Sequence, residues 1–99
     1  MSGNYVLDGH TPRLEPDLMK WGAEFRKDRH VGRTDVGEAT VSTVFLGIDH
    51  NWGDGPPVLF ETMVFGGDHD QWTDRYRTWD EAEAGHARVV AALREGVKP

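Results

Sequence analysis

The chain has 99 residues, of which 37% are hydrophobic and 28% charged, with no cysteine and a net charge of −6 at pH 7. This length supports one modest hydrophobic core, so we expect a single domain over residues 1–99. The acidic balance argues against direct binding to nucleic acid or to an anionic membrane, and the absence of cysteine excludes disulfides, a thiolate nucleophile and cysteine-based zinc sites.

Residues 1–13 are predicted to form an irregular N-terminal arm, because Asp8-Gly9 and Thr11-Pro12 are turn signals. This stretch lacks the basic and apolar segments of a signal peptide. No apolar run in the chain approaches the roughly 20 residues that cross a bilayer. We therefore expect a cytoplasmic protein that has no membrane partner.

A first helix is predicted from about Pro16 to Lys27. Proline is favourable in the first turn of a helix, and basic residues are favourable in the last turn. Leu18, Trp21 and Phe25 recur at spacings of three and four residues, which places them on one face. We expect that face to pack on a sheet.

A long antiparallel hairpin is predicted from two runs rich in β-branched and aromatic residues, Thr40 to Ile48 and Val58 to Phe65. Both alternating faces of the first run carry apolar residues, which indicates a central strand covered on both sides along part of its length. The polar segment from Arg29 to Val36 is predicted to be an edge strand, and Gln71 to Arg77 a further strand.

The C-terminal helix has the clearest local pattern. Thr78 and Glu81 form a capping box, and Gly96 is placed to end the helix. One face of this helix carries Ala82, His86, Val89, Val90 and Leu93. Together these elements predict an α+β domain, in which an antiparallel meander sheet of three to four strands carries an N-terminal and a C-terminal helix packed on it.

The segments STVFLGIDHNWGDGPPVLFETMVFGG and RYRTWDEAEAGH resemble a group of short uncharacterised proteins encoded by bacteriophages of actinobacteria and by related bacteria. The resemblance covers roughly the stretch from Val41 to His86. It implies a phage or prophage accessory protein that acts in a bacterial cytoplasm. It assigns no catalytic residue.

Metal-capable side chains gather near two predicted turns, at Asp49, His50 and Asp54 and at Asp68, His69 and Asp70. At about 3.3 Å per residue, a strand of about eight residues separates the two groups by more than about 20 Å. One site that uses both groups is therefore disfavoured unless a second subunit supplies one half. The alternative is turn chemistry, in which Asp and Asn side chains bond their own backbone. We predict no metal site and no cofactor.

Glu61 and His86 are a candidate polar pair. Glu61 interrupts an apolar strand, and His86 lies on the apolar face of the C-terminal helix. If both side chains point inward, they form a buried pair that could serve as an acid/base couple. The alternative is a solvent-facing Glu61 and a core histidine whose hydrogen bonds are satisfied.

Arg75, Tyr76 and Arg77, with Trp72 and Trp52 nearby, have the chemistry to bind a phosphate-bearing nucleotide by stacking and bidentate hydrogen bonds. Alternation directs the aromatic and arginine side chains to opposite faces, which weakens such a site within one subunit. Alternatively, these arginines pair with surface carboxylates.

The loop from Asn51 to Pro57 presents Trp52 and Asp54 among turn residues, and a tryptophan in such a loop either folds back or anchors a partner. The first hypothesis is therefore a phage accessory binding protein that modulates a host protein, including a defence component. The second is a protein that sequesters a nucleotide at a subunit interface, and the third is a small metal-dependent hydrolase. Four tryptophans in so short a chain favour an interface, so we also expect a homo-oligomer.

Overall fold

The computed structural model describes residues 3–99, so Met1 and Ser2 of the predicted arm lie outside the described residues. The elements in chain order are β1 (Tyr5–Asp8), β2 (Thr11–Leu14), α1 (Leu18–Phe25), β3 (His30–Val36), β4 (Ala39–Phe45), β5 (Phe60–Phe65), β6 (Thr73–Tyr76) and α2 (Trp79–Arg94). Within the described residues, neither helix has the length and apolar character needed to cross a membrane. The predicted α+β class, with an N-terminal and a C-terminal helix, is confirmed.

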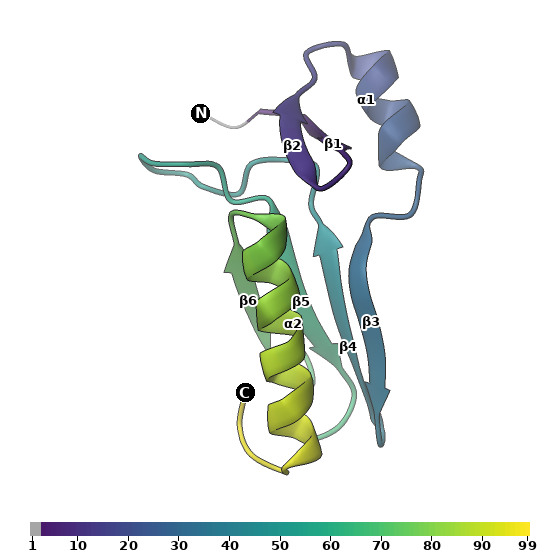
Figure 1. The fold of residues 1–99 in the computed structure, drawn as a ribbon, viewed down its shortest axis with the longest axis vertical. Helices are drawn as coiled ribbons and strands as arrows, with labels where there is room; N and C mark the ends of the chain where they lie inside the picture. The colour runs from purple at the N-terminus through teal and green to yellow at the C-terminus, as the bar shows by residue number, and fades with distance from the viewer. Residues whose placement is uncertain (1–2) are drawn as a thin grey trace.

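The main sheet is an antiparallel meander in the order β3-β4-β5-β6, as predicted (Figure 1). β4 and β5 are the central strands, and Thr43 of β4 lies opposite Thr62 of β5. The polar strand β3 forms one edge, which is where unpaired backbone groups and polar side chains are tolerated. β4 ends at Phe45, before the predicted limit of Ile48, and Gly47 shortly after it has a φ of 77°.

The predicted irregular arm is wrong, because the N-terminal residues form a second, two-stranded sheet. β1 pairs with β2 around a tight turn in which Gly9 has a φ of 63°. The hairpin is too short to be stable alone, and it docks on the segment after β4 through long-range backbone bonds. The amide of Tyr5 donates to the Gly47 carbonyl over 2.8 Å, and the amide of Asp49 donates to the Gly3 carbonyl over 3.0 Å.

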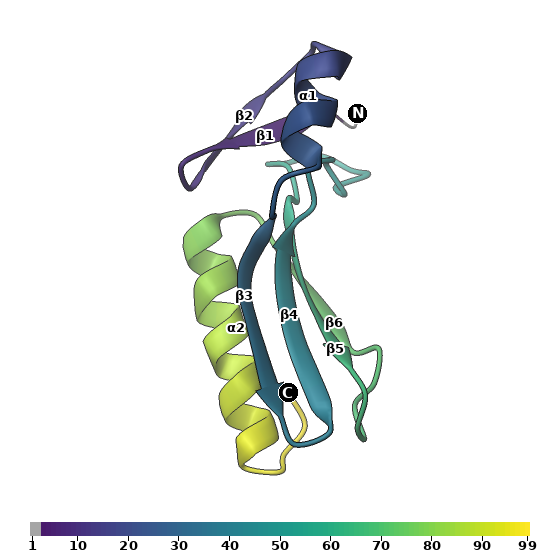
Figure 2. The same ribbon diagram turned by 90° about the vertical axis from the view of Figure 1, so that its right-hand side faces the viewer.

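α1 is shorter than the predicted helix because its N-cap is Asp17, after Pro16. The Asp17 side chain accepts from the backbone amides of Met19 and Lys20 over 2.9 and 3.3 Å, which satisfies N–H groups that have no partner within the helix. Trp21 donates from Nε1 to the Gly47 carbonyl over 3.0 Å. α1 therefore lies with the β1–β2 hairpin at one end of the main sheet, and α2 alone covers the sheet face (Figure 2).

The core lies between α2 and one face of the sheet. Alternate residues of β4 are buried, namely Ala39, Val41, Thr43 and Phe45. On the opposite face Val44 and Met63 are half-buried, and Phe65 is 49% exposed. The prediction that the first hairpin strand is covered on both sides is wrong, because no second helix lies over this face in the described chain (Figure 2).

Gly85 lets α2 approach the sheet closely. A Cβ atom at this position would overlap the ring of Tyr76, whose side chain is buried beneath the helix. Gly22, in the middle of α1, has nothing within 4 Å of the corresponding position. These two helical glycines therefore form a matched pair for a stability measurement.

We expect Gly85→Ala to lower the free energy of unfolding by about 1–3 kcal/mol, because the added methyl group overpacks the contact with Tyr76. Gly22→Ala should instead leave stability unchanged or raise it by up to about 1 kcal/mol, since alanine is the better helix former. Urea denaturation of both variants measures the difference. Equal effects of the two substitutions would contradict the close approach.

Candidate functional site

His86 is a core histidine with both ring nitrogens hydrogen-bonded. Its Nε2 lies 2.9 Å from the Thr34 hydroxyl, and its Nδ1 lies 2.7 Å from the Thr43 hydroxyl. Thr43 contacts the Thr62 hydroxyl, which accepts a 3.0 Å hydrogen bond from Tyr76. If each hydroxyl donates one hydrogen bond, Tyr76 donates to Thr62, Thr62 to Thr43, and Thr43 to Nδ1 of His86. The imidazole is then neutral, with its proton on Nε2.

Glu61 does not join this network, so the predicted buried pair with His86 is not formed. Its carboxylate accepts from Nε of Arg75 over 2.9 Å on the sheet face opposite α2. Glu61 is directly cross-strand from Arg75, and β5 alternation directs its neighbour Thr62 toward the helix. The structure therefore matches the alternative interpretation of both residues, and the sheet itself separates Glu61 from His86.

The metal-capable aspartates act in turns. Asp49 is buried and accepts from the amides of Asn51 and Val58 over 2.7 and 2.9 Å. Asp70 accepts from the amide of Gly66 over 2.6 Å. Within residues 3–99, no three His, Asp or Glu side chains lie together in a way that could hold a metal ion.

Of the predicted nucleotide-binding residues, Arg75, Tyr76 and Arg77 border one hollow of about 420 Å³, whereas Trp52 and Trp72 do not line it. Tyr76 is buried beneath α2, Arg75 lies on the other face, and Trp72 packs against the core beside Val36. Arg77 instead donates from Nε to the Pro56 carbonyl over 3.2 Å. The remaining lining of this hollow is largely charged, with Asp74, Glu81 and Arg88, and neither tryptophan reaches it for stacking.

The loop from Asn51 to Pro57 is held by hydrogen bonds and displays its tryptophan. The Asn51 side chain donates to the carbonyls of Asp54 and Pro56 over 3.0 and 2.9 Å, and accepts from the amide of Gly53 over 3.0 Å. Trp52 is 78% exposed, and the Asp54 side chain is exposed beside it. Of the two interpretations, a tryptophan that folds back onto the domain is wrong, because most of the Trp52 side chain is exposed and the aromatic ring beside it is that of His50 in the same segment.

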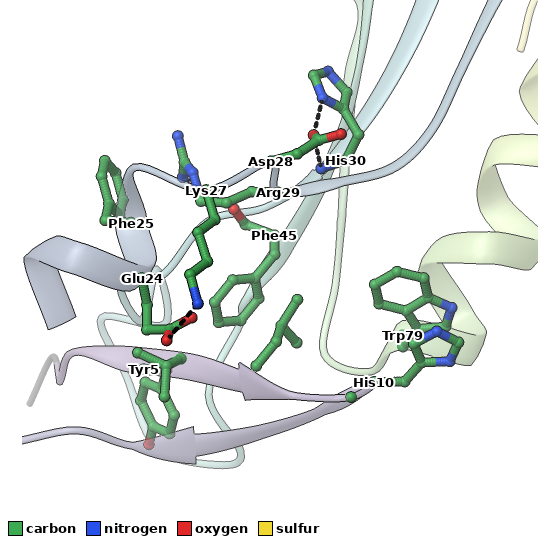
Figure 3. A pocket seen from close by; sticks show the side chains of 13 residues that line it. Tyr5, His10, Glu24, Phe25, Lys27, Asp28, Arg29, His30, Phe45 and Trp79 are labelled. Carbon is green, nitrogen blue, oxygen red and sulfur yellow. Dashed lines mark hydrogen bonds and ion pairs between the residues drawn. The ribbon is translucent and has the colours of Figure 1, made fainter. Parts of the chain in front are cut away.

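A cavity with aromatic walls lies elsewhere, between the main sheet and the N-terminal unit, which consists of the β1–β2 hairpin and α1. This cavity of about 410 Å³ is bounded by the β1–β2 hairpin, by residues 24–30, by β4 and by the start of α2 (Figure 3). Its lining includes the aromatic rings of Tyr5, Phe25, Phe45 and Trp79. The cavity is present because the N-terminal unit contacts one end of the main sheet, and α2 does not extend over that end (Figure 1).

A stacked pair of rings connects the hairpin turn to α2 beside the cavity. His10 lies on Trp79 with ring centroids 3.8 Å apart and an interplanar angle of 4° (Figure 3). Trp79 also contacts Phe60 edge-on, with centroids 6.2 Å apart. The cavity wall is therefore continuous with the core beneath α2.

The charged side chains around the cavity are mostly paired with one another. Lys27 contacts Glu24 over 3.0 Å, and His30 contacts Asp28 over 2.8 Å. Hydrogen bonds from the His30 amide and ring lower the pKa of the Asp28 carboxyl. Arg29 lies between Asp28 and His30 in the sequence, and its guanidinium has no carboxylate within 4.0 Å in the described chain.

Sequence reasoning missed this cavity. Its residues come from β1, the chain after α1, β4 and α2, and no local spacing links them. The available signal was the charged cluster of Glu24, Lys27, Asp28 and Arg29, which we divided between the end of the predicted helix and the start of the predicted edge strand. The His10–Trp79 stack joins residues far apart in the chain, so only the folded structure brings them together.

Comparison of this chain with protein-family models, with curated proteins and with solved structures gave no significant match. The resemblance to phage proteins therefore stays a prediction.

The buried position of His86 predicts a loss of stability in mild acid. Burial lowers the pKa of this imidazole below its ordinary value of 6.5. Above pH 6.5 the group is neutral in the folded and unfolded chain, so it adds no pH dependence. Below that pH the unfolded chain takes up the proton first, so the free energy of unfolding falls until the pH passes the folded pKa.

Urea denaturation between about pH 7.5 and about pH 5 measures this effect, which is worth up to about 1.4 kcal/mol per unit of pKa difference. His86→Gln should show a smaller fall in stability over this range than the wild type. His30→Gln, at an exposed histidine, serves as the control and should keep the wild-type pH dependence. A wild-type slope in His86→Gln would contradict the assignment.

Proposed function

We propose that this chain is a binding protein for a small organic ligand, and that the cavity beside the N-terminal hairpin is its site. The observation that carries this proposal is a hollow of about 410 Å³ lined by four aromatic side chains. Ligand sites in proteins commonly measure about 300–1,000 Å³ and are lined mainly by apolar and aromatic groups with a few polar ones. This protein would act by sequestering its ligand in a bacterial cytoplasm.

The lining chemistry supports binding more than turnover. Within the described chain, the cavity lining contains no serine, threonine or cysteine that could act as a nucleophile. The carboxylates of Glu24 and Asp28 are already engaged by Lys27 and His30. The sequestering hypothesis is therefore retained, but we place its site in this aromatic cavity within one subunit and not at Arg75 and Arg77, whose hollow has mostly charged walls.

The experiment that tests this proposal blocks the cavity and measures binding of a neutral aromatic probe, 2-naphthamide. We expect Leu7→Trp to lower the affinity for 2-naphthamide at least about tenfold, because Leu7 lines the cavity and a larger ring would occupy it. Leu14→Trp makes the same substitution on the neighbouring strand, where Leu14 is 61% exposed and does not line the cavity. Chemical-shift perturbation of the full chain reports both affinity and location.

No shift of cavity residues with the wild-type protein would remove the proposed function. Equal loss of binding in Leu7→Trp and Leu14→Trp would show that the probe binds at another place.

A second candidate function is supported by the displayed loop. We propose that, as a phage accessory protein, the chain also modulates a host protein, including a defence component, through Trp52. A tryptophan that is 78% exposed on a loop fixed by three Asn51 hydrogen bonds has the character of an interface hot spot. Self-association stays a prediction, and the sheet face not covered by α2 is where a second copy would lie.

We expect Trp52→Ala to abolish capture of a protein partner from actinobacterial host lysate while changing the free energy of unfolding by less than about 0.5 kcal/mol, because its side chain has little burial to lose. Met19→Ala is the matched control, since Met19 is 85% exposed on α1 and lies outside the loop. Affinity pull-down followed by mass spectrometry measures capture. Undiminished capture by Trp52→Ala would remove this candidate.

A further inference from the structure

Arg29 is held in one orientation at the cavity. Its Nη1 donates to the carbonyls of Phe45 and Leu46 over 3.1 and 3.4 Å. Its guanidinium carbon lies 3.8 Å from the centroid of the Phe25 ring, a cation–π contact. The Arg29 backbone is fixed as well, because its carbonyl accepts from the Phe45 amide over 2.8 Å. A side chain held in this way loses little further freedom when it binds a ligand.

The Arg29 charge lacks the partner that a partly buried cation requires. The neighbouring carboxylates contact other side chains, Glu24 with Lys27 and Asp28 with the His30 ring, and neither lies within 4.0 Å of the Arg29 guanidinium. Burial lowers the pKa of the Arg29 guanidinium, which reflects the cost of its charge in this position. Arginine nevertheless stays protonated in proteins. An anion bound beside it would offset that cost.

The donors of Arg29 are only partly used. A guanidinium has five N–H donors, and within residues 3–99 only Nη1 donates to a protein acceptor. The edge formed by Nε and Nη2 makes no hydrogen bond to the described chain. Since no buried side-chain nitrogen lacks a partner, this edge is open to solvent or to a ligand. Two parallel N–H groups of this kind match a carboxylate or phosphate group.

We propose that the ligand of the cavity is a small aromatic anion, with its ring among the aromatic walls and its carboxylate or phosphate group on Arg29. This inference rests on the proposed function, and it adds the chemical class of the ligand. Tyr5, Phe45 and Trp79 supply apolar surface for a flat ring. The net charge of −6 repels anions from a distance, and screening limits that repulsion to about 8–10 Å, so recognition depends on direct contact with Arg29.

The experiment compares three probes of similar shape on the full chain by isothermal titration calorimetry. The probes are 2-naphthoate, 2-naphthyl phosphate and the neutral 2-naphthamide. We expect at least one anion to bind about tenfold or more tightly than the amide, as a charge-assisted bidentate contact requires. Comparing the carboxylate with the phosphate distinguishes the two sources of the anionic group.

Arg29→Gln should reduce the preference for the anion to less than about threefold, because the affinity for the anion falls more than the affinity for 2-naphthamide when the charge-assisted contact is removed. Arg26→Gln removes an exposed arginine that does not line the cavity, and it should keep the wild-type preference. Should Arg29→Gln fail to fold, the wild-type ratio of anion to amide affinity still decides the question.

The outcomes separate this inference from the proposed function. Equal affinity for the amide and both anions would overturn the ligand class while leaving small-ligand binding in place. An anion preference that survives Arg29→Gln would overturn the role of Arg29. Failure of all three probes to bind would overturn both proposals.

Discussion

The close packing of α2 against the main sheet determines how the other elements are arranged. Gly85 removes the side chain that would keep the helix away from Tyr76, and Thr43 and Thr62 beneath it are fully buried. Such polar groups are tolerated in a core only when they are hydrogen-bonded. His86 hydrogen-bonds Thr43, and the Tyr76 hydroxyl hydrogen-bonds Thr62. These hydrogen bonds fix the position of α2 on the sheet.

Because α2 covers only part of the main sheet, the N-terminal unit contacts the end that α2 does not cover. α2 begins at Trp79, level with the end of β4, and the β1–β2 hairpin and α1 lie beyond that point (Figure 1). The two units meet through the Gly47 carbonyl, which accepts from Tyr5 and from the Trp21 ring. The His10–Trp79 stack is a further contact between the hairpin and α2, and the cavity lies beside it, where the two units do not fill the space between them.

Two features of the folded chain bear on its function. The cavity combines aromatic walls with Arg29, whose charge has no carboxylate partner in the described chain. The loop presents Trp52, and Arg77 helps to hold that loop by bonding Pro56. Both features support a binding protein. Of the sites first considered, Glu61 and His86 lie on opposite sides of the sheet, and Arg75 and Arg77 border a hollow with mostly charged walls.

The sequence alone determined the features that depend on neighbouring residues. The Thr78–Glu81 capping box, the meander order and the alternation of β4 were all predictable, because capping and pleating are local properties of the chain. Only the tertiary structure decided which face α2 covers, that residues 5–14 form a hairpin, and that Arg29 and Trp79 border one cavity. The alternation of residues along a strand shows which side chains share a face, but it does not show which face a helix covers. Strands of only four residues are not stable alone, so the β1–β2 hairpin depends on the surface against which it packs.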